Sequence, residues 1–118
     1  MIHQFVPDVS DSDVERVITR DWPAEEHEAI RAMIGQVKVR ETPRVILACL
    51  KTSNGDTQRL KRNLADAPGY YREIIGDAEY PNYMRKVFRI DKLTDAEQLA
   101  LIEKDKKQYL NWLYGPTT

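Results

Sequence analysis

Apolar side chains recur every three or four positions along most of this chain, and proline, glycine and helix-capping residues separate one recurrence from the next. This spacing places the apolar side chains on one face of an α-helix, which is then buried against neighbouring helices. β-Branched residues nowhere alternate cleanly over five positions, so strands are not expected. The sequence therefore predicts an all-α fold, a compact orthogonal or irregular bundle of five or six helices in a single domain over residues 1–118.

Local start and stop signals divide the chain into helical segments. They predict helices over about residues 11–20, 23–37, 42–54, 56–67, 70–79 and 94–113. We expect an extended arm of about residues 1–9 before the first helix and a short helical turn after Pro81. The strongest local signal is Thr94-Asp95-Ala96-Glu97, a capping box in which the hydroxyl and the carboxylate each accept from a free backbone amide. Pro68-Gly69 is expected to end the fourth helix before the fifth begins.

The charge of the chain is nearly balanced but unevenly distributed. A net charge of −1 gives the whole molecule no electrostatic attraction to nucleic acid or to an anionic membrane. Residues 1–36 hold eight acids and three bases, whereas the remainder holds 15 bases and 11 acids. Either these two parts neutralise each other, or they form opposed patches of which one meets a charged partner.

No residue pattern in the chain is typical of catalysis, metal binding or a cofactor. The two histidines, His3 and His27, lie far apart, and the five glycines are isolated, so neither a zinc spacing nor a phosphate loop is present. The single cysteine, Cys49, lies in an apolar run, where we expect a buried and unreactive thiol. No apolar run approaches the ~20 residues needed to cross a bilayer, and no signal peptide is visible, so we expect a cytoplasmic location.

The segment from Tyr80 to Arg89 is the first candidate for a partner-binding site. It interleaves aromatic and basic side chains, namely Tyr80, Tyr83, Arg85, Lys86 and Arg89. Tyrosine and arginine are enriched in protein interfaces because they combine apolar area with hydrogen-bonding groups. The alternative is that Tyr83, Val87 and Phe88 pack inward while the basic side chains extend into solvent.

The C-terminal end of the last predicted helix is the second candidate. Its apolar residues extend most of the way round the helix, which is more than one neighbouring helix can cover. Either the arm, through residues 2–6, covers the remainder, or a second copy of the chain does, which makes a homodimer a hypothesis. The candidate partner-binding residues are therefore Tyr80, Tyr83, Arg85, Lys86, Tyr109, Trp112 and Tyr114.

Three classes of function are consistent with these features. The first is a protein–protein interaction module, with a protein partner or the chain itself as its ligand. The second is a nucleic-acid-associated factor with a basic face at residues 59–62 and 85–89, which include Arg59, Lys61 and Arg62. The third is an enzyme or ligand binder with Glu73, Asp77 and Tyr80 in a pocket. The lack of excess positive charge disfavours the second class, and the absence of a catalytic motif disfavours the third.

One part of the chain resembles a segment found in small, uncharacterised bacterial helical proteins. The resemblance covers about a third of the chain, and its residues are Arg44-Val45-Ile46-Leu47-Ala48-Cys49-Leu50, Asn54-Gly55-Asp56, Leu60, Tyr71-Arg72-Glu73-Ile74-Ile75 and Ala78-Glu79-Tyr80-Pro81. It implies a bacterial source and carries no known activity, so it assigns no residue a role.

Overall fold

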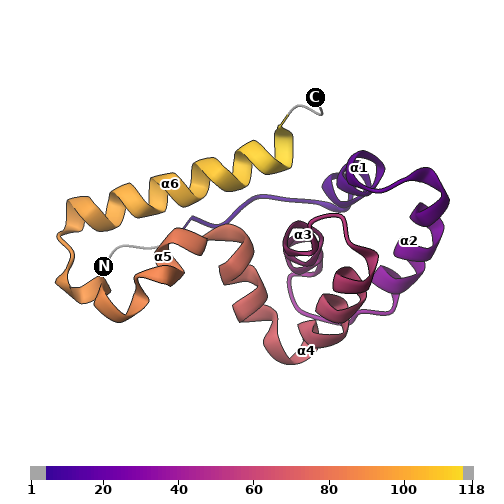
Figure 1. The fold of residues 1–118 in the computed structure, drawn as a ribbon, viewed down its shortest axis with the longest axis horizontal. Coiled ribbons are helices and arrows are strands. Elements are labelled where there is room, and N and C mark those ends of the chain that lie inside the picture. Colours follow the sequence, from indigo (N-terminus) through magenta and orange to yellow (C-terminus); the bar gives the residue numbers. More distant parts are fainter. Residues whose placement is uncertain (1–4, 116–118) are drawn as a thin grey trace.

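The regular secondary structure is entirely helical over residues 5–115, which are the residues that the computed structural model describes. In chain order the elements are α1 (Asp11–Asp21), the 3₁₀ turn η1 (Ala24–Glu26), α2 (His27–Gly35), α3 (Thr42–Ser53), α4 (Thr57–Glu79), α5 (Pro81–Arg85), the 3₁₀ segment η2 (Val87–Lys92) and α6 (Asp95–Tyr114). Figure 1 shows α3 end-on between α1 and α4, with α6 extending away above α5. The predicted all-α fold is confirmed.

Helix α3 is the centre of the core. All six side chains of residues 45–50 are at most 1% exposed, so this helix is buried on every side of its middle two turns. A helix that is apolar all round must be surrounded by other elements. Helices α1 and α4 supply most of the covering side chains, namely Val14, Val17, Ile18, Leu60, Leu64 and Ala67.

Capping residues set the helix boundaries where local signals are strong. Thr94 and Glu97 form the predicted capping box of α6: the Thr94 amide donates to the Glu97 carboxylate at 3.0 Å, and the Glu97 amide donates to the Thr94 hydroxyl at 3.1 Å. Helix α3 ends as predicted at Asn54 and Gly55, which adopt positive φ angles of 53° and 76°. Asparagine and glycine tolerate this left-handed backbone better than other residues.

The prediction of one continuous helix over residues 23–37 is wrong. The chain instead makes the 3₁₀ turn η1 and then the nine-residue helix α2. The Glu26 amide donates to the Pro23 carbonyl at 3.0 Å, a three-residue spacing that winds the chain more tightly than an α-helix. His27 fixes the same corner, because its Nε2 lies 2.6 Å from the Trp22 carbonyl oxygen as a hydrogen-bond partner.

The predicted interruption at Pro68-Gly69 is observed as a kink within α4, which consists of two helical parts. The backbone bends at Tyr70, whose φ of −131° and ψ of 26° are not helical. Proline lacks an amide hydrogen and crowds the carbonyl of the preceding turn, which is a common cause of a kink. The chain therefore changes direction at the place where the sequence predicted the end of the fourth helix and the start of the fifth.

A buried ion pair joins the start of α3 to the end of α4. The Arg44 guanidinium donates two hydrogen bonds to the Glu79 carboxylate, from Nε and Nη2, both at 2.7 Å. Glu79 is fully buried, and this burial raises its pKa, whereas the hydrogen bonds from Arg44 act in the opposite direction. Two parallel charge-assisted bonds also fix orientation, so the pair sets the register between the two helices.

The N-terminal arm is observed from Phe5 onward, and residues 1–4 lie outside the described residues. Residues 5–9 carry no regular secondary structure, and they run alongside α6 (Figure 1). The Phe5 ring meets Tyr109 of α6 edge-on, with 6.0 Å between the ring centroids. Because Tyr109 is fully buried, Phe5 forms part of the cover over the C-terminal half of α6.

We expect Phe5→Ala to lower the free energy of unfolding by about 1–2 kcal/mol, because it removes a half-buried ring and an aromatic pair. Urea denaturation measures the change. The matched control is Val6→Ala, because Val6 is 63% exposed and its truncation should change stability by less than about 0.5 kcal/mol. Equal effects of the two substitutions would show that the arm does not pack on α6.

Candidate protein-binding surface

The end of the molecule formed by α5, η2 and the start of α6 is held in place by one buried carboxylate. Asp105 of α6 accepts hydrogen bonds from the Asn82 amide at 2.9 Å, the Asn82 side chain at 2.8 Å and the Tyr83 amide at 3.0 Å. These are free amides of the first turn of α5, which need acceptors. Asp105 thereby fixes the start of the segment that carries residues 85–92. We call the exposed residues of 85–104 the tip surface.

The tip surface exposes large apolar side chains. Phe88 is 95% exposed, Leu99 is 52% exposed and Val87 is 40% exposed. These are three of the six large apolar or aromatic side chains that stay exposed within residues 5–115. Single exposed apolar residues are common in proteins, but several on one part of the surface mark an interaction site.

A shallow apolar groove lies between the start of η2 and α6. Its volume is about 270 Å³, and its floor is formed by Leu93, Ala100 and Leu101. Lys86, Glu97 and Lys104 form the charged part of its lining. An apolar floor with charged residues at the edge is the usual arrangement of a protein-binding site.

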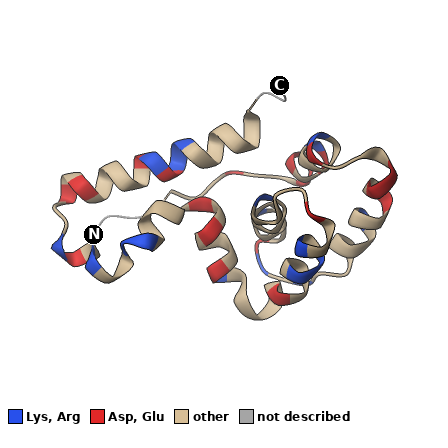
Figure 2. Cartoon of the chain, in the orientation of Figure 1, with Lys and Arg blue, Asp and Glu red and all other residues tan. Residues whose placement is uncertain are grey.

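The charges of the tip surface are divided into two halves. Residues 85–92 are predominantly basic, with Arg85, Lys86, Arg89 and Lys92 against the single acid Asp91. Residues 95–104 are predominantly acidic, with Asp95, Glu97 and Glu103 against the single base Lys104. All nine side chains are exposed, and Figure 2 shows both halves at the same end of the molecule.

Four of the seven predicted partner-binding residues lie at or beside this surface. Arg85 and Lys86 are exposed and belong to the basic half. Tyr80 and Tyr83 are half-buried, and their rings pack edge-on with centroids 6.4 Å apart. The two tyrosines therefore pack within the segment that leads to residues 85–92 and do not project from its surface. Phe88 is the residue that the sequence analysis missed as a candidate.

The exposure of Phe88 contradicts the alternative in which this ring packs inward. Phe88 lies in η2, and its three-residue turn directs successive side chains differently from the α-helical spacing assumed in the sequence analysis. A signal was present in the sequence: Phe88 is flanked by Arg85, Lys86 and Arg89, which all require solvent.

The other predicted residues lie at the far end of α6, where the chain covers its own apolar surface. Tyr109 is fully buried, and this burial raises its pKa. Trp112 is half-buried and packs on Tyr109 with ring centroids 5.6 Å apart. Phe5 of the arm also packs on Tyr109, so the arm covers part of the apolar surface at this end, and the homodimer stays a prediction.

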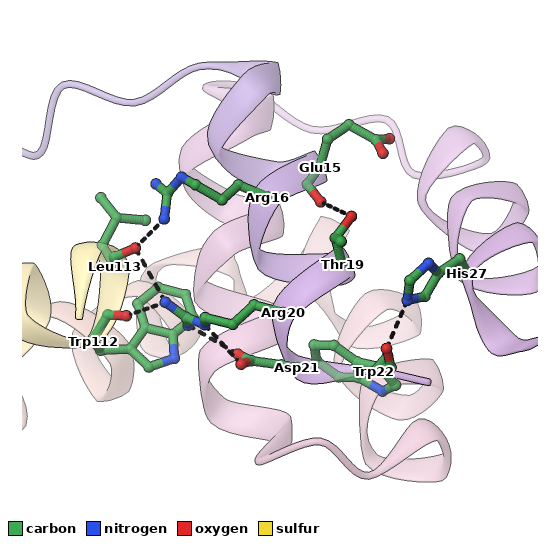
Figure 3. Close-up of polar contacts among 9 residues, drawn as sticks. All are labelled: Glu15, Arg16, Thr19, Arg20, Asp21, Trp22, His27, Trp112 and Leu113. Carbon is green, nitrogen blue, oxygen red and sulfur yellow. Dashed lines mark hydrogen bonds and ion pairs between the residues drawn. The ribbon is translucent and has the colours of Figure 1, made fainter. Parts of the chain in front are cut away.

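Two arginines of α1 hold this end of α6 in place (Figure 3). Arg16 donates to the Leu113 carbonyl, and Arg20 donates to the Trp112 carbonyl at 2.6 Å. Their guanidinium groups also lie over aromatic rings, at 5.1 Å from the centroid of Tyr114 and 5.4 Å from that of Trp112. Positively charged side chains at a helix C-terminus donate hydrogen bonds to its free carbonyls and interact favourably with the negative end of its dipole. Tyr114, 59% exposed, is the one predicted residue here with a largely free side chain among those described.

The structure does not bring the two predicted basic clusters onto one face. Arg59, Lys61 and Arg62 lie in the first turns of α4, beside the core helices, whereas residues 85–89 lie at the tip (Figures 1 and 2). A phosphate backbone is normally held by a continuous basic surface. The positions of the two clusters therefore do not support a single basic face for nucleic acid made of residues 59–62 and 85–89.

The predicted carboxylate and tyrosine pocket is not assembled either. Glu73 and Asp77 are exposed on α4, and neither lines the tip groove or the two cavities described next. Within residues 5–115, no three histidine, cysteine, aspartate or glutamate side chains are grouped so that they could hold a metal ion. His3 lies outside the described residues.

Two further cavities of about 320 Å³ each lie outside the tip. One, between α2 and α4, is lined by the partly or fully buried apolar side chains Met33, Val37 and Leu64 and by four exposed residues. The other, where α1, α3 and α6 end, includes Lys51, whose pKa is lowered by burial. Neither has an exposed aromatic anchor, so the tip surface is the stronger candidate.

Comparisons of the chain with protein-family models, curated proteins and solved structures gave no match. The resemblance to small bacterial helical proteins therefore stays a prediction. Within the described part of the chain, no helix is both long and apolar enough to span a bilayer.

We expect Asp105→Ala to lower the free energy of unfolding by about 2 kcal/mol or more, because it leaves at least two amides at the start of α5 without their acceptor. Thermal or urea unfolding measures the loss. Glu103→Ala is the matched control on the same helix, because Glu103 is exposed and should change stability by less than about 0.5 kcal/mol. If Asp105→Ala left the free energy of unfolding unchanged, Asp105 could not be the residue that holds the tip in place.

We expect Cys49 to react with a thiol reagent only after unfolding. The side chain is fully buried, and burial raises its pKa to about 12, so the thiol stays neutral in the folded protein throughout the usual pH range. In denaturant the pKa returns to about 8.5 and labelling becomes fast near that pH. Labelling that is equally fast in buffer and in denaturant would contradict a buried Cys49.

Proposed function

We propose that this chain is a protein-interaction module whose tip surface binds an acidic, apolar segment of a partner. The observation that carries the proposal is Phe88, an aromatic ring that is 95% exposed and lies two residues after Lys86, which lines a groove with an apolar floor. An aromatic side chain held out in solvent next to such a groove gains free energy as soon as a partner covers it.

The expected gain is large enough to matter for affinity. Full burial of one phenylalanine side chain contributes about 1.5–3 kcal/mol, and Val87 and Leu99 add smaller amounts. Aromatic residues and arginine dominate the binding energy of most interfaces, and Phe88 lies between Arg85 and Arg89.

The charge of the segment favours an acidic partner. Four bases and one acid in residues 85–92 attract a negatively charged surface and disfavour a positively charged one. Because all these side chains are exposed, we expect the attraction to weaken as salt is added. The apolar floor of the groove then requires apolar side chains among the partner's acids.

Site-specific photocrosslinking tests the proposal. A benzophenone amino acid replaces Phe88 in the full chain, expressed in its native cell, and a second variant carries it in place of Tyr70, which is 61% exposed on α4. We expect a discrete adduct at position 88 that is absent at position 70. Its formation should fall at least about tenfold when Arg85→Glu and Arg89→Glu are added, because like charges then face the partner.

The matched charge control is the pair Arg59→Glu and Arg62→Glu, which makes the same change of charge away from the tip. This control should leave the adduct at position 88 unchanged. Equal adducts at positions 70 and 88, or equal losses with both charge-reversal pairs, would refute binding through the tip surface.

A further inference from the structure

The partner required by the proposed function has a counterpart within the chain itself. A segment that combines acidic and apolar side chains begins α6 and reads Asp95-Ala96-Glu97-Gln98-Leu99-Ala100-Leu101-Ile102-Glu103. Its exposed residues include Leu99 and Glu103, which share one face because they lie four positions apart. Both belong to the tip surface, as do Phe88 and the basic residues.

We propose that the tip surface binds a second copy of this chain in a two-fold symmetric dimer, in which Phe88 of each copy enters the groove of the other. This inference rests on the proposed function and names its partner. In a two-fold interface the same patch meets itself, so every group of one half needs its complement in the other half. The tip surface meets that requirement.

The charges provide the first complement. The basic half, residues 85–92, carries a net charge of +3 from four bases and one acid, and the acidic half, residues 95–104, carries a net charge of −2 from three acids and Lys104. A two-fold axis between the halves brings the basic half of each copy against the acidic half of the other. Opposite potentials are thereby matched twice in one interface.

The shapes provide the second complement. Phe88 is a ring without cover, and the groove between η2 and α6 is an apolar cavity without an occupant within the described residues. An apolar cavity of about 150 Å³ is large enough to bind benzene. A groove of about 270 Å³ therefore has room for the Phe88 ring of the other copy.

The far end of α6 offers a second copy less than the tip does. Arg16 and Arg20 of the same chain already occupy its terminal carbonyls, and Phe5 lies on Tyr109. Tyr109 and Leu113 are covered within one chain, and Tyr114 is the large exposed side chain at that end among the described residues.

A pair of opposite charge-reversal variants tests the dimer. In the basic-half variant, Arg85→Glu and Arg89→Glu make the whole tip acidic; in the acidic-half variant, Asp95→Lys and Glu103→Lys make it basic. We expect the unaltered chain to be dimeric in sedimentation equilibrium at low salt. Each variant alone should associate at least about tenfold more weakly, because like charges face each other across the two-fold axis.

Mixing the two variants should restore the dimer, since each altered half then meets an opposite charge. Loss of folding cannot produce this recovery, and circular dichroism of each variant verifies the helices. Phe88→Ala should weaken the dimer about a hundredfold or more, because both buried rings are lost, while leaving stability nearly unchanged, because the ring is 95% exposed in one chain.

A monomer at every concentration, or a dimer that is insensitive to these substitutions, would overturn the inference. The crosslinking experiment separates this failure from failure of the proposed function. An adduct at position 88 with twice the mass of the chain supports the dimer, whereas an adduct with a different protein, from a chain that is monomeric, refutes the dimer and keeps the interaction module. If crosslinking at position 88 yields no more adduct than crosslinking at position 70, both the dimer and the proposed function are refuted.

Discussion

The burial of α3 on every side is the constraint on which the rest of the structure depends. Six consecutive side chains, residues 45–50, are at most 1% exposed, and no single neighbour can cover a helix that is apolar all round. The chain therefore surrounds α3 with α1, α4 and parts of α2 and α6. The Arg44 and Glu79 pair then fixes where α4 lies along α3, because its two hydrogen bonds tolerate one geometry.

This arrangement explains why the N-terminal half of α6 is less covered by other helices than its C-terminal half. Tyr109 and Leu113, in its C-terminal half, belong to the core cluster around α3 and are held there by Arg16 and Arg20. A 20-residue helix is about 30 Å long, which is more than the core around α3 can cover. Within residues 5–115, the N-terminal half therefore extends past the core and lies beside α5 and η2 (Figure 1), where Leu99 is 52% exposed.

The sequence predicted the features that depend on neighbouring residues, and the features that depend on distant ones had to be observed. Thr94 and Glu97 are three residues apart and complete their capping box without outside help, so the start of α6 was predictable. Pro68 and Gly69 likewise indicated the interruption that is observed as the kink at Tyr70, because a proline ends or bends a helix through its own missing amide hydrogen. The burial of Tyr109, in contrast, depends on Phe5, which lies 104 positions earlier in the chain. For the candidate site, the sequence located the basic and aromatic segment but not the exposure of Phe88, which follows from the 3₁₀ geometry of η2.

The buried polar contacts of α6 also bear on how well the tip can bind. Exposed apolar residues on a mobile segment would lose conformational entropy on binding, and that loss offsets much of the gain from burial. Here Asp105 fixes the start of α5, and Gln108 donates to the Ala78 and Glu79 carbonyls at 3.0 and 3.2 Å, which fixes the end of α4. The segment that carries Phe88 is thus tied to α6 before any partner arrives. Because its ordering cost is met during folding, more of the free energy from covering Phe88 is left for association.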